Sequence, residues 1–273
     1  LCLHRLLLFY PARPGAVRAA RKKLVMVRIG GVALALAAVL LGFGYGTLDI
    51  AAIGEAARAG TASPVTIAAA AGIALAAVLK SAQFPTHGWL TEVMETPTPV
   101  SALLHAGVVN LGGVVLIRLS PLLDAVPAAR WLLVIAGLAT ALLAGMVMLT
   151  RVSIKVRLAW STVAQMGFML LQCGLGAFAT AGLHIAAHAL YKAHAFLTAG
   201  GAVDRARVRA LAGPSGPAPA WVAPGVAGAA GAVAAGAALA LALGMPAGSV
   251  VLVSVLLLGL LPPTAGRARV GGR

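Results

Sequence analysis

Charged side chains are scarce in this chain of 273 residues. Lys, Arg, Asp and Glu together make up 10% of the sequence, whereas a soluble domain usually carries about a quarter. Hydrophobic residues make up 61%, so the composition excludes an ordinary water-soluble domain and a disordered chain as well. The shortage of charge therefore points to a protein that lies in a membrane.

Acidic residues and cysteines are scarcer still. The chain holds six Asp and Glu residues, and no Glu follows Glu95. Cys2 and Cys173 lie far apart, and Cys173 lies in an apolar segment, so we expect neither a disulfide framework nor a metal site built on cysteine. We expect no cleavable signal peptide before the first basic stretch. Because Leu1 stands in the middle of an amphipathic run, we expect a piece of a longer protein.

Long uncharged runs divide the chain into candidate membrane helices. Residues 59–79, 96–117 and 210–266, for example, carry no charged side chain. About 20 apolar residues cross the hydrocarbon core of a bilayer as a helix. The sequence therefore predicts an all-α, polytopic transmembrane bundle of about eight spans, at residues 30–48, 64–83, 99–118, 130–150, 158–176, 181–200, 219–243 and 248–262.

The formal net charge of +15 is explained by where the basic residues lie. With eight spans and both ends cytoplasmic, 16 of the 21 Lys and Arg residues lie inside, and Arg58, Arg118 and Arg130 lie outside. This asymmetry is the positive-inside distribution of a membrane protein in contact with lipid, so we expect no nucleic-acid partner. The predicted domains are a basic cytoplasmic juxtamembrane segment at 1–28, a transmembrane domain at 29–262 and a short basic cytoplasmic tail at 263–273.

Prolines interrupt the chain at the end of the second predicted span. Pro85 follows Phe84, and Pro97 and Pro99 follow an amphipathic piece that contains Glu92. Proline removes a backbone donor and clashes with the preceding turn, so we expect one broken helix near Phe84-Pro85. A break at membrane depth requires protein or water to satisfy the freed backbone groups.

Two titratable residues stand alone in apolar segments. Lys80 lies sixteen residues after Pro64, and no other basic residue is expected to lie so deep beside a helix break. A charge at that depth costs about 2.5–3.5 kcal/mol on insertion scales and indicates a functional site, unless the lysine snorkels to the interface. His105 could exchange a proton near neutral pH or could be a hydrogen-bonded core histidine. The residues alone leave both alternatives open.

A third cluster lies on one helical face. His184, His188 and Lys192 are spaced i, i+4 and i+8, whereas His194 points elsewhere. A row of titratable groups is what proton transfer along a helix needs. Two histidines four residues apart could also share zinc, but a zinc protease requires Glu directly after the first His, and here Ile185 follows.

Lys155 precedes the fifth predicted span. It could be an ordinary anchor on the cytoplasmic side, as we expect for Arg157, or it could lead protons to the path. The sequence does not separate these two roles.

Three ordered blocks carry a family resemblance. The first runs from Lys80 through Pro85 to His105, the second from Ile154 to Met169, and the third is the helix of His184. They resemble the antiporter-like subunits, which are the large proton-pumping membrane subunits of respiratory complex I and their relatives in Mrp-type antiporters. Details such as residues 86–89 (Thr-His-Gly-Trp) and 172–178 are most similar to the DabB group, the membrane subunits of bacterial two-component inorganic-carbon pumps.

The resemblance implies a function, a partner and a set of site residues. The implied function is that of a non-enzymatic, proton-conducting membrane subunit of an energy-coupled bicarbonate/CO₂ uptake complex in the bacterial inner membrane. The implied partner is a DabA-like, zinc-containing soluble subunit. No cofactor, metal, quinone or nucleotide site is expected in this chain. The implied proton relay consists of Lys80, His105, Lys155, His184, His188 and Lys192.

Other functions remain open at this point. One is subunit L of NADH-quinone oxidoreductase (complex I) or a subunit of a Mrp-type cation/proton antiporter. Another is a non-conducting membrane scaffold, because the glutamate that pairs with the Lys80 position in the family has no counterpart after Leu1. An intramembrane enzyme would need a general base and a nucleophile, and the sequence offers no such constellation.

Overall fold

The computed structural model describes residues 2–60, 63–93 and 96–201, together with the isolated positions 207, 211, 231, 234, 238 and 242. The chain divides into two compact units, Leu1–Gly201 and Ala202–Arg273, and the helices below belong to the first. Apart from the isolated positions, the predicted spans at 219–243 and 248–262 and the predicted tail at 263–273 lie outside the described residues.

The N-terminal part consists of a short helix and a long one. The short helix α1 (Cys2–Leu7) ends before a turn, and the long helix α2 (Pro14–Tyr45) follows it. Proline at the first helical position costs no hydrogen bond, because that N–H has no partner within a helix. At Gly46 the left-handed backbone (φ 68°) ends α2. Residues 14–28, predicted as a juxtamembrane segment, are therefore the first half of a 32-residue helix that continues into the first span.

Two capped helices follow. Asp49 begins α3 (Ile50–Ala59), and its carboxylate accepts a hydrogen bond from the N–H of Ala51 at 3.0 Å. Ser63 begins α4 (Pro64–Lys80) in the same way, with its hydroxyl 3.2 Å from the N–H of Thr66. The sequence analysis predicted α4 and did not predict α3.

The predicted helix break near Phe84-Pro85 is confirmed. Helix α4 ends at Lys80, and a non-helical stretch leads to the single turn α5 (Gly88–Thr91). Side chains satisfy the freed backbone. The N–H of Phe84 donates to the hydroxyl of Thr140 at 3.0 Å, and the hydroxyl of Thr86 donates to the carbonyl of Gln83 at 2.9 Å. The break is thus held by protein contacts, as a break at membrane depth requires.

The remaining helices form most of the bundle. They are α6 (Thr98–Ala106), the 3-10 turn η2 (Val108–Asn110), α7 (Leu111–Arg118), α8 (Ser120–Asp124), α9 (Pro127–Leu149), α10 (Ile154–Gly174) and α11 (Phe178–Ala199). They match the predicted spans at 99–118, 130–150, 158–176 and 181–200. Pro97 and Pro99 stand at the start of α6.

Three helical segments in the described part of the chain are long and apolar enough to cross a membrane. They are Pro14–Tyr45, Thr98–Arg118 and Pro127–Leu149, and α4 is a shorter apolar helix. Helices α10 and α11 have the length of a span, with 21 and 22 residues, but carry more polar side chains. Thr98–Arg118 is by far the most buried of the three.

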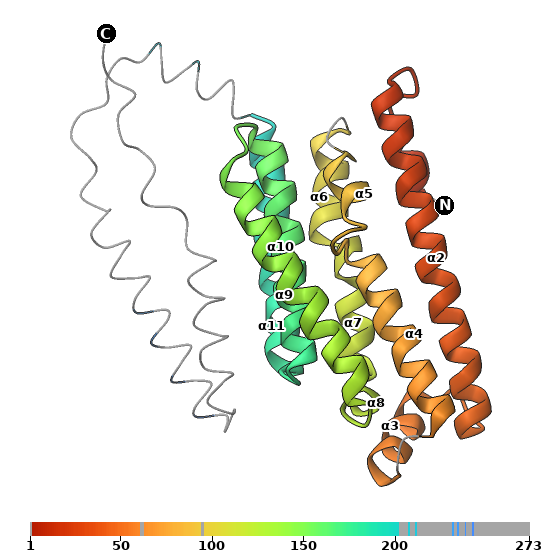
Figure 1. The fold of residues 1–273 in the computed structure, drawn as a ribbon. Coiled ribbons are helices and arrows are strands. Elements are labelled where there is room, and N and C mark those ends of the chain that lie inside the picture. The colour runs from red at the N-terminus through yellow and green to blue at the C-terminus, as the bar shows by residue number, and fades with distance from the viewer. Residues whose placement is uncertain are drawn as a thin grey trace. The chain divides into compact units, whose positions relative to one another are not determined.

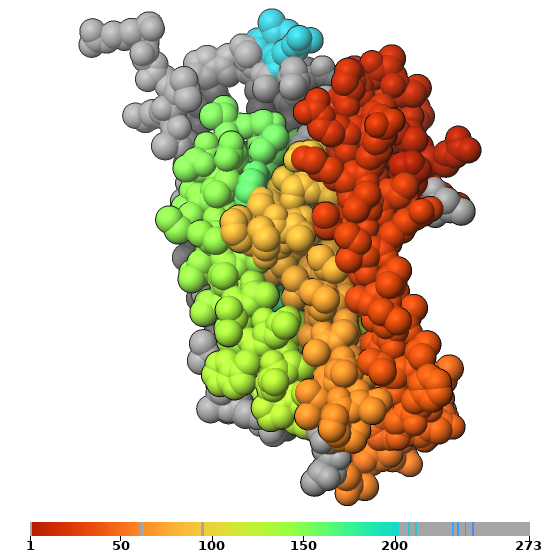
Figure 2. Space-filling model, turned by 45° about the vertical axis from the view of Figure 1, so that its right-hand side comes forward, coloured from red at the N-terminus to blue at the C-terminus, as the bar shows by residue number. Residues whose placement is uncertain are grey.

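The helices of this unit pack side by side around that buried segment. Helix α4 packs against α2, α9 and α7, helix α10 packs against α9 and α11, and α11 packs against α6. Figure 1 shows the long α2 beside α4, with α9 beyond it. In Figure 2, α2 forms the red column along one side, and the orange residues of α4 and α5 separate it from the green α9 and α10. Most of the candidate site residues come from α6, α10 and α11.

Glycines allow α9 and α10 to touch along their backbones. A Cβ atom on Gly137 would lie 2.6 Å from the carbonyl oxygen of Gly167, and a Cβ on Gly167 would lie 2.7 Å from the carbonyl oxygen of Gly137. Small residues permit such close approach between membrane helices. This close contact holds α10 in place. Helix α10 supplies one partner of each polar contact of the α11 row described next.

Candidate functional site

The predicted row of titratable residues on α11 lies on one face and points into the bundle. His184, His188 and Lys192 are 1%, 2% and 0% exposed, whereas His194 is exposed. The ring centroids of His184 and His188 are 6.0 Å apart. The geometry therefore brings together three of the six predicted relay residues in a single buried row.

Helix α10 supplies a polar partner for each member of the row. Nδ1 of His184 lies 2.9 Å from Oε1 of Gln172, and Nδ1 of His188 lies 2.8 Å from Oε1 of Gln165. Nζ of Lys192 donates to the hydroxyl of Ser161 and, at 3.3 Å, to the carbonyl oxygen of Leu158.

The pairing follows from the antiparallel arrangement of the two helices. Residues 175–177 join α10 to α11, and Gly176 (φ 82°) makes the left-handed turn there. Gln165 and His188 lie at nearly equal numbers of residues from this turn and therefore face each other, as do Ser161 and Lys192. Gln172 lies nearer to the turn than its partner His184 does.

Sequence reasoning missed the roles of the α10 side chains. Ser161, Gln165 and Gln172 are spaced i, i+4 and i+11, which places them on one helical face opposite the histidines. That spacing is the signal by which they could have been found.

A second helix interruption, which was not predicted, lies beside this row. Helix α6 ends at Ala106, and the 3-10 turn η2 precedes α7. The interruption leaves carbonyl groups without their helical donors. Side chains bind three of them: Nε2 of His188 lies 3.1 Å from the oxygen of His105, Nδ2 of Asn110 donates to Ala106 at 2.7 Å, and the hydroxyl of Ser81 donates to Val109 at 3.2 Å. A 3-10 stretch inside a span often marks a functional position.

The imidazole of His105 lies at the centre of the bundle. The residue is fully buried, and its ring stacks on Phe196 with centroids 4.4 Å apart and planes 19° apart. Neither ring nitrogen has a hydrogen-bond partner within the described residues.

Lys80 lies apart from the α11 row, at the C-terminal end of α4. Its side chain is half-buried against α2, where a Cβ atom on Gly30 would lie 3.3 Å from Cγ of Lys80. Lys192 is more buried than Lys80, because Lys192 lies on a helix covered by α10 and α6, whereas Lys80 lies at a helix end. Lys23 of α2 is 7% exposed and interacts electrostatically with Lys80.

Lys155 joins the start of α10 to the segment that enters α6. Its Nζ donates to the carbonyl oxygen of Thr96 at 2.7 Å, and the hydroxyl of Thr96 lies 3.1 Å from that of Ser101 on α6. Lys155 is therefore bound to the helix that carries His105, on the side where α6 begins.

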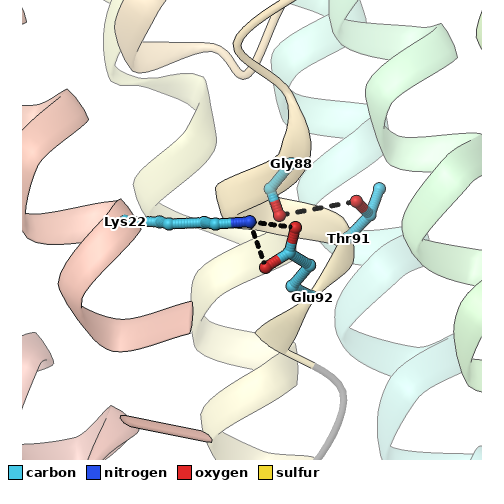
Figure 3. Close-up of polar contacts among 4 residues, drawn as sticks. All are labelled: Lys22, Gly88, Thr91 and Glu92. Carbon is cyan, nitrogen blue, oxygen red and sulfur yellow. Dashed lines mark hydrogen bonds and ion pairs between the residues drawn. The ribbon is translucent and has the colours of Figure 1, made fainter. Parts of the chain in front are cut away.

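An ion pair connects α2 to the interrupted region. Figure 3 shows Nζ of Lys22 between the two carboxylate oxygens of Glu92, at 2.6 and 2.8 Å. The two side chains are 48% and 41% exposed, so the pair contributes little to stability, about 0–1 kcal/mol. It does fix the position of the segment after α5 relative to α2.

The arrangement places groups that can exchange protons next to one another. The described residues contain no group of three His, Cys, Asp or Glu side chains placed as metal ligands. They do contain buried nitrogen and oxygen atoms that can donate or accept protons in close succession along α11. The main-chain oxygen of His105 contacts this row at His188, whereas Lys80 and Lys155 lie outside the row.

Comparisons with known proteins show the family of the chain. The family model for NADH:quinone oxidoreductase/Mrp antiporter, transmembrane, matches residues 1–216. The chain is 50% identical over 212 residues to the probable inorganic carbon transporter subunit DabB of Hydrogenovibrio crunogenus, covering 77% of this chain and 41% of that protein. It is 50% identical over 206 residues to the probable subunit DabB2 of Halothiobacillus neapolitanus, covering 75% and 37%.

A more distant relative gives the same family, and a solved structure gives the same fold. The chain is 36% identical over 209 residues to NAD(P)H-quinone oxidoreductase chain 5 of Synechocystis sp., covering 74% of this chain and 31% of that one. Its fold matches a chain of the membrane-bound sulfane sulfur reductase, an archaeal respiratory complex, with a TM-score of 0.64, 22% identity and coverage of 71% and 41%. The chain thus spans less than half the length of these relatives. It is a membrane protein and belongs to the NADH:quinone oxidoreductase/Mrp antiporter transmembrane family.

Proposed function

We propose that this chain conducts protons as a membrane subunit of an energy-coupled complex that takes up inorganic carbon. Two of its relatives at 50% identity are named as probable inorganic carbon transporter subunits. The proton path is proposed to use Lys80, His105, Lys155, His184, His188 and Lys192. The carbon chemistry is assigned to the partner, and the chain itself is proposed to act as a transporter subunit rather than an enzyme.

The buried row on α11 is the observation that carries the proposal. Polar and ionisable side chains inside a membrane bundle are costly, and they mark ion or proton paths where they occur in series. A helix needed only for packing would bury apolar residues at these positions. Instead His184, His188 and Lys192 are all buried, and each meets a polar side chain of α10.

The interruption of α6 links the row on α11 to His105, another residue of the proposed proton path. His188 touches the carbonyl oxygen of His105. The ring nitrogens of His105 are buried and have no hydrogen-bond partner among the described residues. Buried polar atoms without a protein partner usually bind water. We propose that water bridges Lys80, His105 and the α11 row.

The proposed partner is a DabA-like, zinc-containing soluble subunit, and the proposed location is the bacterial inner membrane. The name DabB of the relatives favours this partner. The positive-inside distribution favours cytoplasmic ends, because 16 basic residues then lie inside and three outside.

The second candidate is a proton-pumping subunit of an NADH-quinone oxidoreductase. The 36% identity to chain 5 of the Synechocystis enzyme supports it. The third candidate, a membrane scaffold that conducts nothing, shares the fold and differs only in flux.

Reconstitution of the complex separates the three candidates. The membrane subunit is purified with the soluble subunit that co-purifies with it, and bicarbonate uptake into vesicles is measured with and without an imposed proton gradient. The proposal expects uptake that collapses when a protonophore is added. Uptake that ignores the gradient supports the scaffold, and co-purification with quinone-reductase subunits supports the second candidate.

A further inference from the structure

The hydrogen bonds of His188 constrain where its protons lie. Nε2 lies 3.1 Å from the main-chain oxygen of His105, and Nδ1 lies 2.8 Å from Oε1 of Gln165. A backbone carbonyl can only accept a hydrogen bond, so Nε2 must carry a hydrogen in every protonation state that keeps this contact. The proton that enters and leaves His188 is therefore the one on Nδ1.

Among the described residues, Gln165 is the side chain that contacts Nδ1, and it can satisfy both states of this nitrogen. When Nδ1 carries a hydrogen, it donates to Oε1 of Gln165. When Nδ1 has lost that hydrogen, its lone pair requires a donor, which the NH₂ group of Gln165 supplies after rotation about the Cγ–Cδ bond. This terminal torsion is soft and nearly two-fold, so the exchange needs no backbone movement. Gln165 is half-buried, which leaves its side chain room to rotate.

We propose that Gln165 is a positioning residue for proton transfer at His188. It holds the imidazole with Nε2 on the carbonyl of His105, and its amide turns over each time Nδ1 gains or loses a proton. This role rests on the proposed function as a proton conductor. It requires an amide, since a carboxylate only accepts hydrogen bonds and an apolar side chain offers neither donor nor acceptor.

The interruption of α6 is a necessary part of this device. In a continuous helix the carbonyl oxygen of His105 would accept the N–H four residues later, and the contact with His188 would compete with it. Because α6 ends at Ala106, the oxygen is available to Nε2. The interruption therefore sets the tautomer of a histidine on a different helix.

Other titratable groups also face His188 and enter the interpretation of any pH dependence. His184 and Lys192 lie on its own helix, and His105 lies on α6. Lys155, at the start of α10, interacts electrostatically with His105. The variants below leave all four unchanged, so a difference between variants reports on the group at position 165.

The decisive variant is Gln165→Glu, studied in the assembled complex in proteoliposomes. Proton flux is measured across a range of pH with a dye trapped in the vesicles, and the amount of inserted protein is measured in parallel. An opposite charge next to a titrating group retains its proton, so the alkaline limb of the flux profile is expected to move up by about one to three pH units. Gln165→Leu removes donor and acceptor and is expected to lower flux at every pH.

Cys173→Ala is the matched control for packing. Cys173 is a fully buried residue of the same helix and takes no part in the row. It is expected to keep the wild-type pH profile. A Gln165→Glu profile identical to the wild type, at normal insertion, would overturn the role of Gln165 and leave the proposed function intact. Absence of flux in the wild-type complex would instead overturn the proposed function.

Discussion

Nε2 of His188 lies 3.1 Å from the main-chain oxygen of His105, although 83 residues separate the two positions in the sequence. This contact joins α11 to the interrupted α6. It therefore connects the row of His184, His188 and Lys192 to the helix that carries His105. It exists because α6 stops at Ala106 and leaves the oxygen of His105 without a helical donor. The break in one helix therefore makes a main-chain oxygen available to a histidine on another helix.

Lys80 provides a test of the proposed proton path at the C-terminal end of α4. Lys80→Ala in the assembled complex is expected to abolish uptake while leaving membrane insertion intact or improved, because a costly charge is removed. Lys80→Arg is also expected to fail, since a guanidinium does not release its proton near neutral pH. Uptake and inserted protein are measured together. Wild-type uptake in the arginine variant would show that Lys80 does not exchange protons.

The topology is tested by reporter fusions. A reporter fused after Arg209 is expected to be cytoplasmic, and one fused near Asp124 is expected to face the other side. Three helices, α9, α10 and α11, separate the two positions, and an odd number of spans places them on opposite sides. A cytoplasmic signal from both fusions would mean that one of these helices does not cross the membrane.

The crossing of α9 and α10 is tested at two glycines of the same helix. In Gly137→Ala the new Cβ would lie 2.6 Å from the backbone of Gly167, so the helices must separate. Overpacking of this kind costs about 1–3 kcal/mol, and less folded protein is expected after detergent extraction. Gly145→Ala is the control, because nothing lies within 4 Å of its Cβ position. Equal thermal stability of the two variants would show that the close crossing does not contribute to stability.

Much of the fold followed from the sequence because the physical signals were strong. Long uncharged runs and Pro85 located the spans and the first break, which α4 and α5 confirm. The face shared by His184, His188 and Lys192 followed from helical periodicity alone.

The rest depended on contacts between segments that are distant in the chain. The sequence near Gly107 does not indicate that the main-chain oxygen of His105 contacts His188. This contact depends on the position of α11, which is distant in the chain. The surroundings of Lys80 could not be predicted for a related reason. Its position within an apolar run gave no information on which helices cover it, and the structure places it at a helix end against α2.

The central claim is that the α11 row moves protons as a unit. His188→Ala and Lys192→Ala are each expected to remove most of the proton flux, and the double variant is expected to remove little more. Such non-additivity is characteristic of coupled groups that act in one process. His194→Ala is the control, since His194 is exposed on the same helix.

The most direct measurement is proton flux in proteoliposomes of the assembled complex, normalised to inserted protein, for wild type, His188→Ala and His194→Ala. The account predicts flux near background in His188→Ala at normal insertion and unchanged flux in His194→Ala. A loss of inserted protein would be expected if His188 only satisfied a hydrogen bond in the core. Normal insertion and wild-type flux in His188→Ala would contradict the assignment of this helix as the proton path.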